Sequence, residues 1–335
     1  MAYMSEERLH ALFQGIGKAR VALIGDLCLD VYWMADMRLS ELSRETPHYP
    51  LPVVEERYSP GGAGNVASNV AALQPACFTV LGAVGQDWRG DMLIKCLKEQ
   101  GVETSFLVQS EDVVTNTYIK PLRKGISHVV YEDPRLDFEN RKPMSAAVEA
   151  SILDALRRAE DRFEVLLVSD QMKFGCVTAK IREEISRLGQ SGKTVIVDSR
   201  DRAGLYHHVI VKPNEVEASR AFGDGSVLEI EDLKKLLPYV SEATGAPAII
   251  TVGDQGCLVW EDGQAIHVPA RHVPPPIDIV GAGDTFLSAL GCAVAGGAKL
   301  AEAARFACLA SSVTIAKVGT TGTASREELQ EKVCL

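Results

Sequence analysis

The chain has 335 residues, 46% of them hydrophobic, and its 45 acidic against 35 basic residues give a formal net charge of -10. This acidic balance, without a long basic cluster, excludes nucleic acid or an anionic membrane as the main partner. The eight cysteines form no C-x-x-C pair, and no segment is apolar for long enough to span a bilayer. We therefore expect a cytoplasmic protein that acts on small molecules and has no membrane partner.

The first 140 residues contain apolar strands and helices together with two irregular, β-rich stretches. A polar-faced helix comes first, before a buried strand that ends at Gly-Asp. The predicted elements are a helix within 1–20, strands at 19–26, 50–58, 77–85, 115–122 and 127–133, and helices at 62–73 and 87–101.

Strands and helices alternate more regularly after Pro143. The predicted elements are helices at 145–161, 178–190, 231–243, 284–297 and 300–318, and strands at 165–170, 194–199, 209–214, 248–253, 257–261 and 265–270. This alternation predicts an α/β fold with a mostly parallel central sheet and helices on both faces. The strands near 50–58 and 113–131 break the alternation, so we expect them to form a small second sheet.

Two glycines and an alanine precede Asp284 in the segment VGAGDTF, at the start of an apolar helix. Because Gly281, Ala282 and Gly283 have little or no side chain, a phosphate can approach their backbone N–H groups and the positive end of the helix. A carboxylate there can accept the proton of an attacking hydroxyl, which favours phosphoryl transfer with Asp284 as the base. An ordinary helix N-cap is the alternative that this segment leaves open.

Two segments near the N-terminus place polar residues where a ligand of a parallel sheet would bind. The segment GDLCLD follows the first strand, so Asp26 and Asp30 are candidates for binding sugar hydroxyls. The segment SPGGAGNVASNVA is a second glycine-rich entry to a helix, with Asn65 just inside it. Helix capping or a surface salt bridge is the alternative for the two acids, and a turn before a packed helix is the alternative for Asn65.

Two later segments have the spacing of a nucleotide site. In KPNEVEA, Asn214 and Glu217 lie three residues apart at a helix start, where they could hold phosphate and Mg²⁺-bound water or form an N-x-x-E capping box. In TVGDQG, residues 251–256, two glycines lie between two strands. A hairpin turn is the alternative reading of the second segment.

The order of these motifs resembles the ribokinase, or PfkB-type, carbohydrate kinase family over about residues 18–320. The resemblance rests on a GG-containing motif in the first quarter, then N-x-x-E, T-x-G-x-x-G and D-x-V-G-A-G-D-T-F. It implies one ribokinase-like kinase domain over residues 1–335, with a small β-sheet lid formed from about 36–60 and 112–132. It also implies ATP as donor, Mg²⁺ as cofactor and a sugar or sugar phosphate as acceptor.

The motif positions of that family imply roles for the residues of this chain. Asp284 would deprotonate the acceptor hydroxyl, and the N–H groups of Gly281, Ala282 and Gly283 would form an anion hole. The remaining implied roles are sugar binding for Asp30 and Asn65, the lid hinge for Gly61 and Gly62, phosphate and Mg²⁺ (through water) for Asn214 and Glu217, the nucleotide site for Thr251, Gly253 and Gly256, and a monovalent cation such as K⁺ for Asp278.

A closer resemblance is to the kinase domain of D-glycero-β-D-manno-heptose 7-phosphate kinases, which act in lipopolysaccharide core precursor synthesis and phosphorylate the C1 hydroxyl. It rests on VALIGDLCLDVYW, SRETPHYPLPVV, GGAGNVASNVAAL, VSDQMKFG and VDSRD. Lys173 stands where that subfamily has a lysine, which implies a substrate-binding role, whereas Arg200 stands where it usually has lysine. The candidates for a clamp on a substrate phosphate are Arg44, Lys120, Arg123, Lys173 and Arg200.

The predicted function is therefore an ATP-dependent sugar kinase acting on C1 of a heptose 7-phosphate. The alternatives are a PfkB-type kinase for another sugar, sugar phosphate or nucleoside, and a non-catalytic sugar- or nucleotide-binding protein. No H-x-G-H motif follows the kinase motifs, so we expect no nucleotidyltransferase domain. Because unpaired strand edges usually need cover, we also expect a homodimer formed through the lid.

Overall fold

The computed structural model describes residues 3–125, 127, 129–319 and 321–334, and a nine-stranded sheet runs through the body of this part of the chain. Its strand order is β14-β13-β12-β11-β10-β9-β1-β4-β5, parallel from β12 to β5 and antiparallel at the β13–β14 edge. Its strands are β1 (Arg20–Gly25), β4 (Cys77–Gly85), β5 (Leu107–Ser110), β9 (Val165–Asp170), β10 (Thr194–Ser199), β11 (Ile210–Val211), β12 (Ala248–Thr251), β13 (Cys257–Glu261) and β14 (Gln264–Val268).

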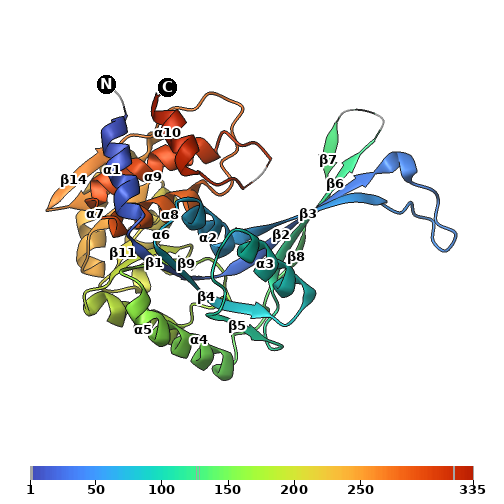
Figure 1. The fold of residues 1–335 in the computed structure, drawn as a ribbon, viewed down its shortest axis with the longest axis horizontal. Helices are drawn as coiled ribbons and strands as arrows, with labels where there is room; N and C mark the ends of the chain where they lie inside the picture. The colour runs from blue at the N-terminus through green and yellow to red at the C-terminus, as the bar shows by residue number, and fades with distance from the viewer. Residues whose placement is uncertain (1–2, 126, 128, 320, 335) are drawn as a thin grey trace.

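Helices cover both faces of this sheet (Figure 1). Alternate residues of each strand point to opposite faces, so Leu23 of β1 joins one buried cluster and its neighbour Ile24 joins the other. The first cluster includes residues of α1 (Glu6–Ile16), α2 (Ala63–Ala72), α3 (Trp88–Glu99), α8 (Ala282–Ala295), α9 (Leu300–Thr314) and α10 (Arg326–Cys334). The second includes residues of α4 (Ala146–Ala159), α5 (Ala179–Gln190), α6 (Glu215–Phe222) and α7 (Ile230–Thr244).

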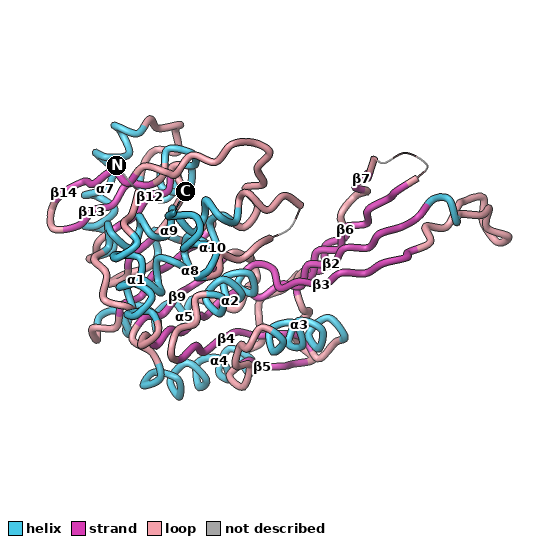
Figure 2. Tube along the Cα trace, turned by 45° about the horizontal axis from the view of Figure 1, so that its top comes forward, coloured by secondary structure: helices cyan, strands magenta, loops and turns pink. Residues whose placement is uncertain are grey.

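A second, smaller sheet projects from the body as an arm, which we call the lid (Figures 1 and 2). Its strand order is β3-β2-β6-β7, and β8 also pairs with β6. The lid strands are β2 (Leu27–Asp36), β3 (Val53–Gly62), β6 (Asn116–Lys124), β7 (Val130–Glu132) and β8 (Leu136–Phe138). The separate small sheet predicted from the broken alternation is thereby confirmed, although residues 126 and 128 of the expected lid lie outside the described residues.

The lid joins the body at one short crossing. Only Asp26 separates β1 in the body from β2 in the lid, and β3 returns at Gly62 directly into α2. The backbone N–H of Ala63 donates a 3.0 Å hydrogen bond to the Asp26 carbonyl, which ties the two crossings together. The lid therefore enters and leaves the body beside the start of α2.

The expectation that Asp30 lies just beyond the end of the first strand was wrong. The chain stays extended after Asp26, and Asp30 lies inside β2, paired with Ser59 of β3 and Tyr118 of β6. Strands β5 and β8 and helix α10 were also not predicted, because these elements are short or polar. No helix among the described residues has the length and apolar character needed to cross a membrane.

Candidate active site

Asp284 lies in the first turn of α8 and contacts a residue of α2. The Nδ2 atom of Asn65 donates a 2.8 Å hydrogen bond to the Asp284 Oδ2 atom. Asn65 is buried, whereas Asp284 keeps part of its surface open to solvent. Burial raises the pKa of the Asp284 carboxyl to about 7, against the hydrogen bond from Asn65, which lowers it. A carboxyl with this pKa can exchange a proton near neutral pH.

The turn before Asp284 is built from residues that leave the backbone bare. Gly281 has φ +80°, and a Cβ on it would lie 2.6 Å from Nδ2 of Asn65, so both the conformation and the space require glycine. A Cβ on Gly283 would meet nothing within 4 Å. The backbone at Gly283 therefore borders open space next to Asp284, as an anion site at a helix N-terminus requires. The Ala282 N–H expected in the anion hole already donates to the Ile279 carbonyl at 3.1 Å.

A buried ion pair lies close to Asp284. The Lys212 Nζ atom is 3.0 Å from the Asp198 Oδ2 atom, and the two side chains are only 4% and 12% exposed. Asp198 raises the pKa of Asp284 and Lys212 lowers it, so both charges act on the same carboxyl. This pair could not be expected from the sequence motifs, because none of them joins the ends of β10 and β11. The signal that could have found it is a lysine at the end of a predicted buried strand.

The lid contributes Asp30 and the two glycines of its return strand. Asp30 is buried, and burial raises the pKa of its carboxyl, while Lys120 and Arg135 lower it. A Cβ on Gly61 would lie 2.8 Å from the Asp30 carboxylate, and Gly62 has φ +55°. The charge of Asp30 also raises the pKa of Asp284, which brings the lid and the start of α8 into one site.

Asn214 and Glu217 form a capping box at the start of α6. The backbone N–H of Glu217 donates to Asn214 Oδ1 at 2.8 Å, and the backbone N–H of Asn214 donates to Glu217 Oε2 at 2.9 Å. Burial raises the pKa of Glu217, and Asp198 raises it further, so this helix start adjoins the buried ion pair. The capping box expected as the alternative for this motif is therefore present. Among the described residues, no hydrogen bond occupies the Oε1 atom of Glu217.

The three residues expected at the nucleotide site surround the connection between β12 and β13. Thr251 lies at the end of β12, and its backbone N–H donates to the Pro213 carbonyl at 3.0 Å, which places it beside Asn214. Gly253 and Gly256 both have positive φ, +47° and +94°, and only glycine suits this tight turn. The strand–turn–strand reading of this segment is correct.

Asp278 connects the approach to α8 with the segment after α9. Its Oδ1 atom accepts a hydrogen bond from the Val280 N–H, and its Oδ2 atom accepts one from the Gly319 N–H, both at 3.0 Å. The Asp278 N–H in turn donates to the Ile315 carbonyl at 2.8 Å. Asp278 therefore fixes the loop that leads to Gly281.

Asp26 is not free to bind a sugar, contrary to the expectation from GDLCLD. Its buried carboxylate accepts hydrogen bonds from the backbone N–H groups of Gln171, Met172 and Cys176, at 2.7 to 2.9 Å. Burial raises its pKa to about 6, while these N–H groups lower it. Asp26 thus holds the loop of residues 171–176, which carries Lys173.

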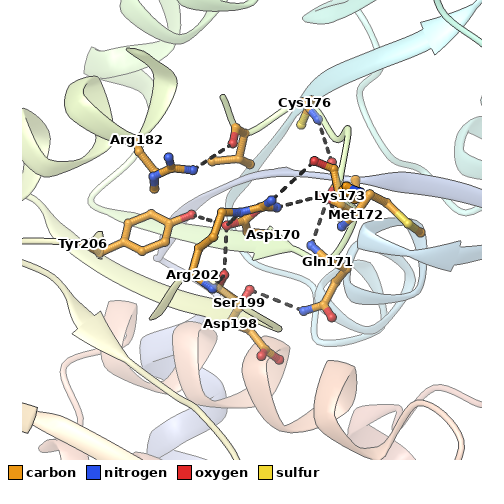
Figure 3. Close-up of polar contacts among 12 residues, drawn as sticks. Asp170, Gln171, Met172, Lys173, Cys176, Arg182, Asp198, Ser199, Arg202 and Tyr206 are labelled. Atoms are coloured by element: carbon orange, nitrogen blue, oxygen red, sulfur yellow. Dashed lines mark hydrogen bonds and ion pairs between the residues drawn. The ribbon is translucent and has the colours of Figure 1, made fainter. Parts of the chain in front are cut away.

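A second buried acid anchors the same loop from the other side. Asp170, at the end of β9, accepts hydrogen bonds from the hydroxyls of Ser199 and Tyr206, each at 2.8 Å, and pairs with Arg202. Arg202 also donates to the carbonyl of Met172 at 2.7 Å. Figure 3 shows Asp170 at the centre of this network, next to Lys173. The position of Lys173 is therefore set by buried charges on both sides of its loop.

The sequence of this chain matches a protein-family model. The model for pfkB family carbohydrate kinases matches residues 18–327. The chain belongs to the PfkB family of carbohydrate kinases. This PfkB-family protein is a sugar kinase, a phosphotransferase, in agreement with the motif order noted above.

Curated relatives of this PfkB-family kinase are named Bifunctional protein HldE. The one from Trichlorobacter lovleyi is 32% identical over 95% of this chain and 64% of its own length. The one from Bradyrhizobium diazoefficiens is 35% identical over 96% of this chain and 64% of its own length. The chain therefore spans less than two-thirds of the length of the relatives that it matches.

Solved structures show the fold of this PfkB-family kinase. Ribokinase of Arabidopsis thaliana, complexed with ribose and ATP, has a TM-score of 0.69 and 18% identity, covering 95% of this chain and 99% of that one. Phosphofructokinase-2 of Escherichia coli, in complex with substrates and products, has a TM-score of 0.70 and 22% identity, covering 94% and 98%. The ribokinase-like fold expected from the motifs is confirmed.

The five basic residues suggested as a phosphate clamp do not lie together in this PfkB-family kinase. Arg123 is held by Asp133 at 2.7 Å in the lid, and Arg44 is exposed in the connection between β2 and β3. The Lys120 ammonium lies 4.9 Å from the ring centre of Tyr32, near Asp30. Arg200 acts on the pKa of Glu217 and so lies on the side of α6. Lys173 lines a pocket of about 210 Å³ together with Asn116 of the lid.

Proposed function

We propose that this sugar kinase transfers the γ-phosphoryl group of ATP to the C1 hydroxyl of a heptose 7-phosphate. The observation that carries the proposal is the contact between Asp284 and Asn65 at the start of α8, where burial raises the pKa of Asp284 to about 7. Asp284 removes the proton of the attacking hydroxyl. The new bond joins the hydroxyl oxygen to the γ-phosphorus, the bond to the bridging oxygen breaks, and ADP leaves.

The start of α8 serves as the anion hole for the transferred group. The N–H groups of Gly281 and Gly283 supply the anion hole, and a Cβ on Gly283 would enter open space. The Ala282 N–H, which already donates to the Ile279 carbonyl at 3.1 Å, lies between them. Negative charge on the phosphoryl oxygens is stabilised there by bare amide donors and the positive end of a 14-residue helix. Thr251, Gly253 and Gly256 border the nucleotide, next to the start of α6.

The acidic groups near α6 fit a magnesium ion that is bound mainly by phosphates and water. The described residues hold no group of three or more His, Cys, Asp and Glu side chains that could bind a metal by themselves. Mg²⁺ needs only one or two carboxylates when phosphate oxygens and water complete its shell, and Glu217 has one oxygen outside its capping box. When bound, the ion would neutralise charge on the ATP phosphates. Asp278 is our proposed ligand for a monovalent cation.

The acceptor is held between the lid and the body. Asp30 and Asn65 bind sugar hydroxyls, and Gly61 and Gly62 form the hinge, because Gly61 leaves room for the Asp30 carboxylate. The choice of a heptose 7-phosphate is supported by the relatives named HldE and by the segments that resemble heptose 7-phosphate kinases.

The test is a coupled assay of ADP release by the purified chain with Mg²⁺-ATP and a panel of acceptors. The panel contains D-glycero-β-D-manno-heptose 7-phosphate, the dephosphorylated heptose, fructose 6-phosphate, ribose and a nucleoside. We expect the heptose 7-phosphate to give the highest kcat/KM and a 1,7-bisphosphate product by ³¹P NMR. Equal or higher kcat/KM with another acceptor would refute the heptose assignment. Repeating the assay with Na⁺ in place of K⁺ tests the monovalent cation.

We also propose a homodimer that buries the exposed apolar residues of the lid. Val53 and Val54, on the edge strand β3, are 44% and 47% exposed, and Tyr131 on β7 is 56% exposed. An open edge carrying apolar side chains favours pairing with another strand. Light scattering is expected to give twice the chain mass of 36.2 kDa. A mass of one chain at micromolar concentration would contradict the dimer.

A further inference from the structure

A side chain of the lid contacts the segment that follows α9. The Arg57 Nη2 atom, on strand β3, donates a 3.2 Å hydrogen bond to the carbonyl of Gly319, although the two residues are 262 positions apart in the chain. Gly319 lies between α9 and α10, and its φ of +77° favours glycine at this turn. The lid is therefore attached to the body at a point distant in sequence from its crossing at Asp26.

The guanidinium group of Arg57 is held within the lid by its neighbours. Tyr32 of β2 stands opposite Arg57 in the strand register, and the guanidinium carbon lies 4.2 Å from the centre of the Tyr32 ring. The Tyr32 hydroxyl also accepts a 3.4 Å hydrogen bond from the Lys120 Nζ atom of β6, so three adjacent strands fix this group. A guanidinium packed over an aromatic ring loses little further freedom when it donates to a carbonyl.

The same face of the lid carries the proposed sugar ligand. Asp30 and Tyr32 are two residues apart in β2, so their side chains point to the same side of the sheet. Lys120 donates to Tyr32 and lowers the pKa of the Asp30 carboxyl, which places its ammonium group near both residues. Arg57 packs over the Tyr32 ring and therefore lies on the face of the lid that would hold an acceptor.

On the body side, Gly319 is tied to the turn that opens α8. Its N–H group donates to the Asp278 Oδ2 atom at 3.0 Å, and the Asp278 Oδ1 atom accepts from the Val280 N–H at the same distance. Gly281, the next residue, is the N-cap of α8, and a Cβ on it would lie only 2.6 Å from Nδ2 of Asn65. Three hydrogen bonds thus lead from a lid side chain to the proposed anion hole.

A surface contact without a function is the alternative for Arg57. Its side chain is exposed, so the loss of one solvent-accessible hydrogen bond should change the stability of the fold very little. Loosening the loop at Gly319, by contrast, would let the N–H donors of the anion hole move away from the transferred phosphoryl group, which slows the reaction. The two interpretations therefore agree on stability and differ in turnover.

We propose that Arg57 is a positioning residue for phosphoryl transfer, because from the lid it holds the loop at Gly319 and, through Asp278, the turn at Gly281. It need not touch either substrate, since it acts through the backbone donors at the start of α8. The alignment of an acceptor under the lid with the γ-phosphoryl group at α8 then depends on this contact between lid and body. The inference rests on the proposed function, which places phosphoryl transfer at α8.

The test compares two variants of the full chain, Arg57→Met and Arg158→Met, with the acceptor that gives the highest kcat/KM in the panel above. Arg158 is the matched control, since it lies on α4 and pairs with Asp154, where the two side chains are 63% and 68% exposed. We expect Arg57→Met to lower kcat roughly 10-fold, with both KM values within about 3-fold and Tm within about 2 °C of the parent. Arg158→Met should match the parent. Parental kcat of Arg57→Met, or a larger drop in its Tm, would overturn the proposal.

A double-mutant cycle separates this inference from the proposed function. If Arg57 acts through Gly319 and Asp278, then Arg57→Met should lower kcat less than about 2-fold further in a chain that already carries Asp278→Ala. Independent effects that multiply would mean that Arg57 acts by another route, and would overturn the proposal. Parental turnover by Asp284→Asn would instead count against the proposed base. Because the acceptor is chosen by its kcat/KM, failure of the heptose assignment leaves this test intact.

Discussion

The side chain of Asn65 donates a 2.8 Å hydrogen bond to Asp284, although the two residues are 219 positions apart in the chain. One lies at the start of α2, where the lid returns to the body, and the other at the start of α8. The two helices pack together, since the Ser288 hydroxyl of α8 also donates to the Val66 carbonyl of α2 at 3.0 Å. The proposed base is therefore oriented by the helix that follows the lid.

Replacing Asp284 by Asn should abolish most turnover without affecting donor binding. The amide keeps the shape of the side chain but cannot accept the hydroxyl proton, so kcat should fall by on the order of 10²–10⁴. ATP affinity, measured by calorimetry, should remain within about 3-fold of the parent. The control is Asp262→Asn, at an exposed acid paired with Lys299, which should behave as the parent. Parental turnover by Asp284→Asn with several sugars would disprove the base assignment.

The pH dependence of kcat/KM should report the ionisation of Asp284. A base must be deprotonated to act, and burial raises the Asp284 pKa from 3.8 to about 7. Activity should therefore be lost as pH falls through about 7, by about tenfold per pH unit at the acidic limit. A profile that stays flat down to about pH 5 would contradict this assignment.

Asn65→Ala should move that acidic limb to higher pH. The hydrogen bond from Asn65 lowers the Asp284 pKa, so its loss should raise the apparent pKa by on the order of 0.5–1 unit. The control is Ser68→Ala on the same helix, because the Ser68 hydroxyl donates only to the Gly64 carbonyl among the described contacts. An unchanged profile for Asn65→Ala would mean that this residue does not tune the base.

Alanine at Gly281 and at Gly283 should have different effects. At Gly281, the positive φ and the 2.6 Å approach to Asn65 oppose a Cβ, so both stability and kcat should fall. At Gly283 there is room for a Cβ, so Tm should stay within about 2 °C of the parent while the methyl group obstructs the γ-phosphate and lowers kcat. Full activity of Gly283→Ala would place the phosphoryl group elsewhere.

Lys212→Met should destabilise the body of the protein and perturb the base. Removing one partner of a buried ion pair leaves Asp198 uncompensated, so the free energy of unfolding should drop by about 3–5 kcal/mol. The Asp284 pKa should rise as well, because Lys212 lowers it. Urea titrations check the first effect, and Lys299→Met, in a pair whose side chains are each 79% exposed, should cost less than about 0.5 kcal/mol. Unchanged stability of Lys212→Met would show that the pair is solvated.

Asp26→Asn should loosen the loop that carries Lys173. An amide can accept only on one side, so at least one of the three N–H groups loses its partner, at a cost of about 1–3 kcal/mol. KM for the acceptor should rise more than KM for ATP, because this loop lines the acceptor side. Equal changes in both KM values would indicate a general loss of folding, which the urea midpoint would reveal.

The local motifs could be predicted from the sequence because each depends on neighbouring residues. VGAGDTF, N-x-x-E and the glycine-rich entry to α2 require particular backbone conformations, and the structure places all three at helix starts. The alternation after Pro143 likewise specified the layers of the body, since period and length separate strands from helices.

The contacts between distant segments could not be predicted in this way. The Asp198–Lys212 pair joins two strand ends, and nothing local requires either residue. Asp26 seemed to be a sugar ligand because its partners are backbone N–H groups 145 to 150 residues away, which no side-chain pattern reveals. The lid strand β2 was not predicted for a different reason. Polar Asp30 alternates with apolar Leu29 and Val31, as in a strand, but these residues were taken as the end of the preceding strand.

Because only Asp26 connects β1 to β2, changes in the lid segment need not alter the body of the protein. The excursion from Leu27 to Gly62 starts and finishes at the same place, so its outer portion can lengthen, shorten or acquire new side chains while β1 and α2 keep their positions. Homologous enzymes can therefore change the molecules they accept, or the surface through which they assemble, by altering the outer part of this segment. The two points where the segment joins the body stay fixed.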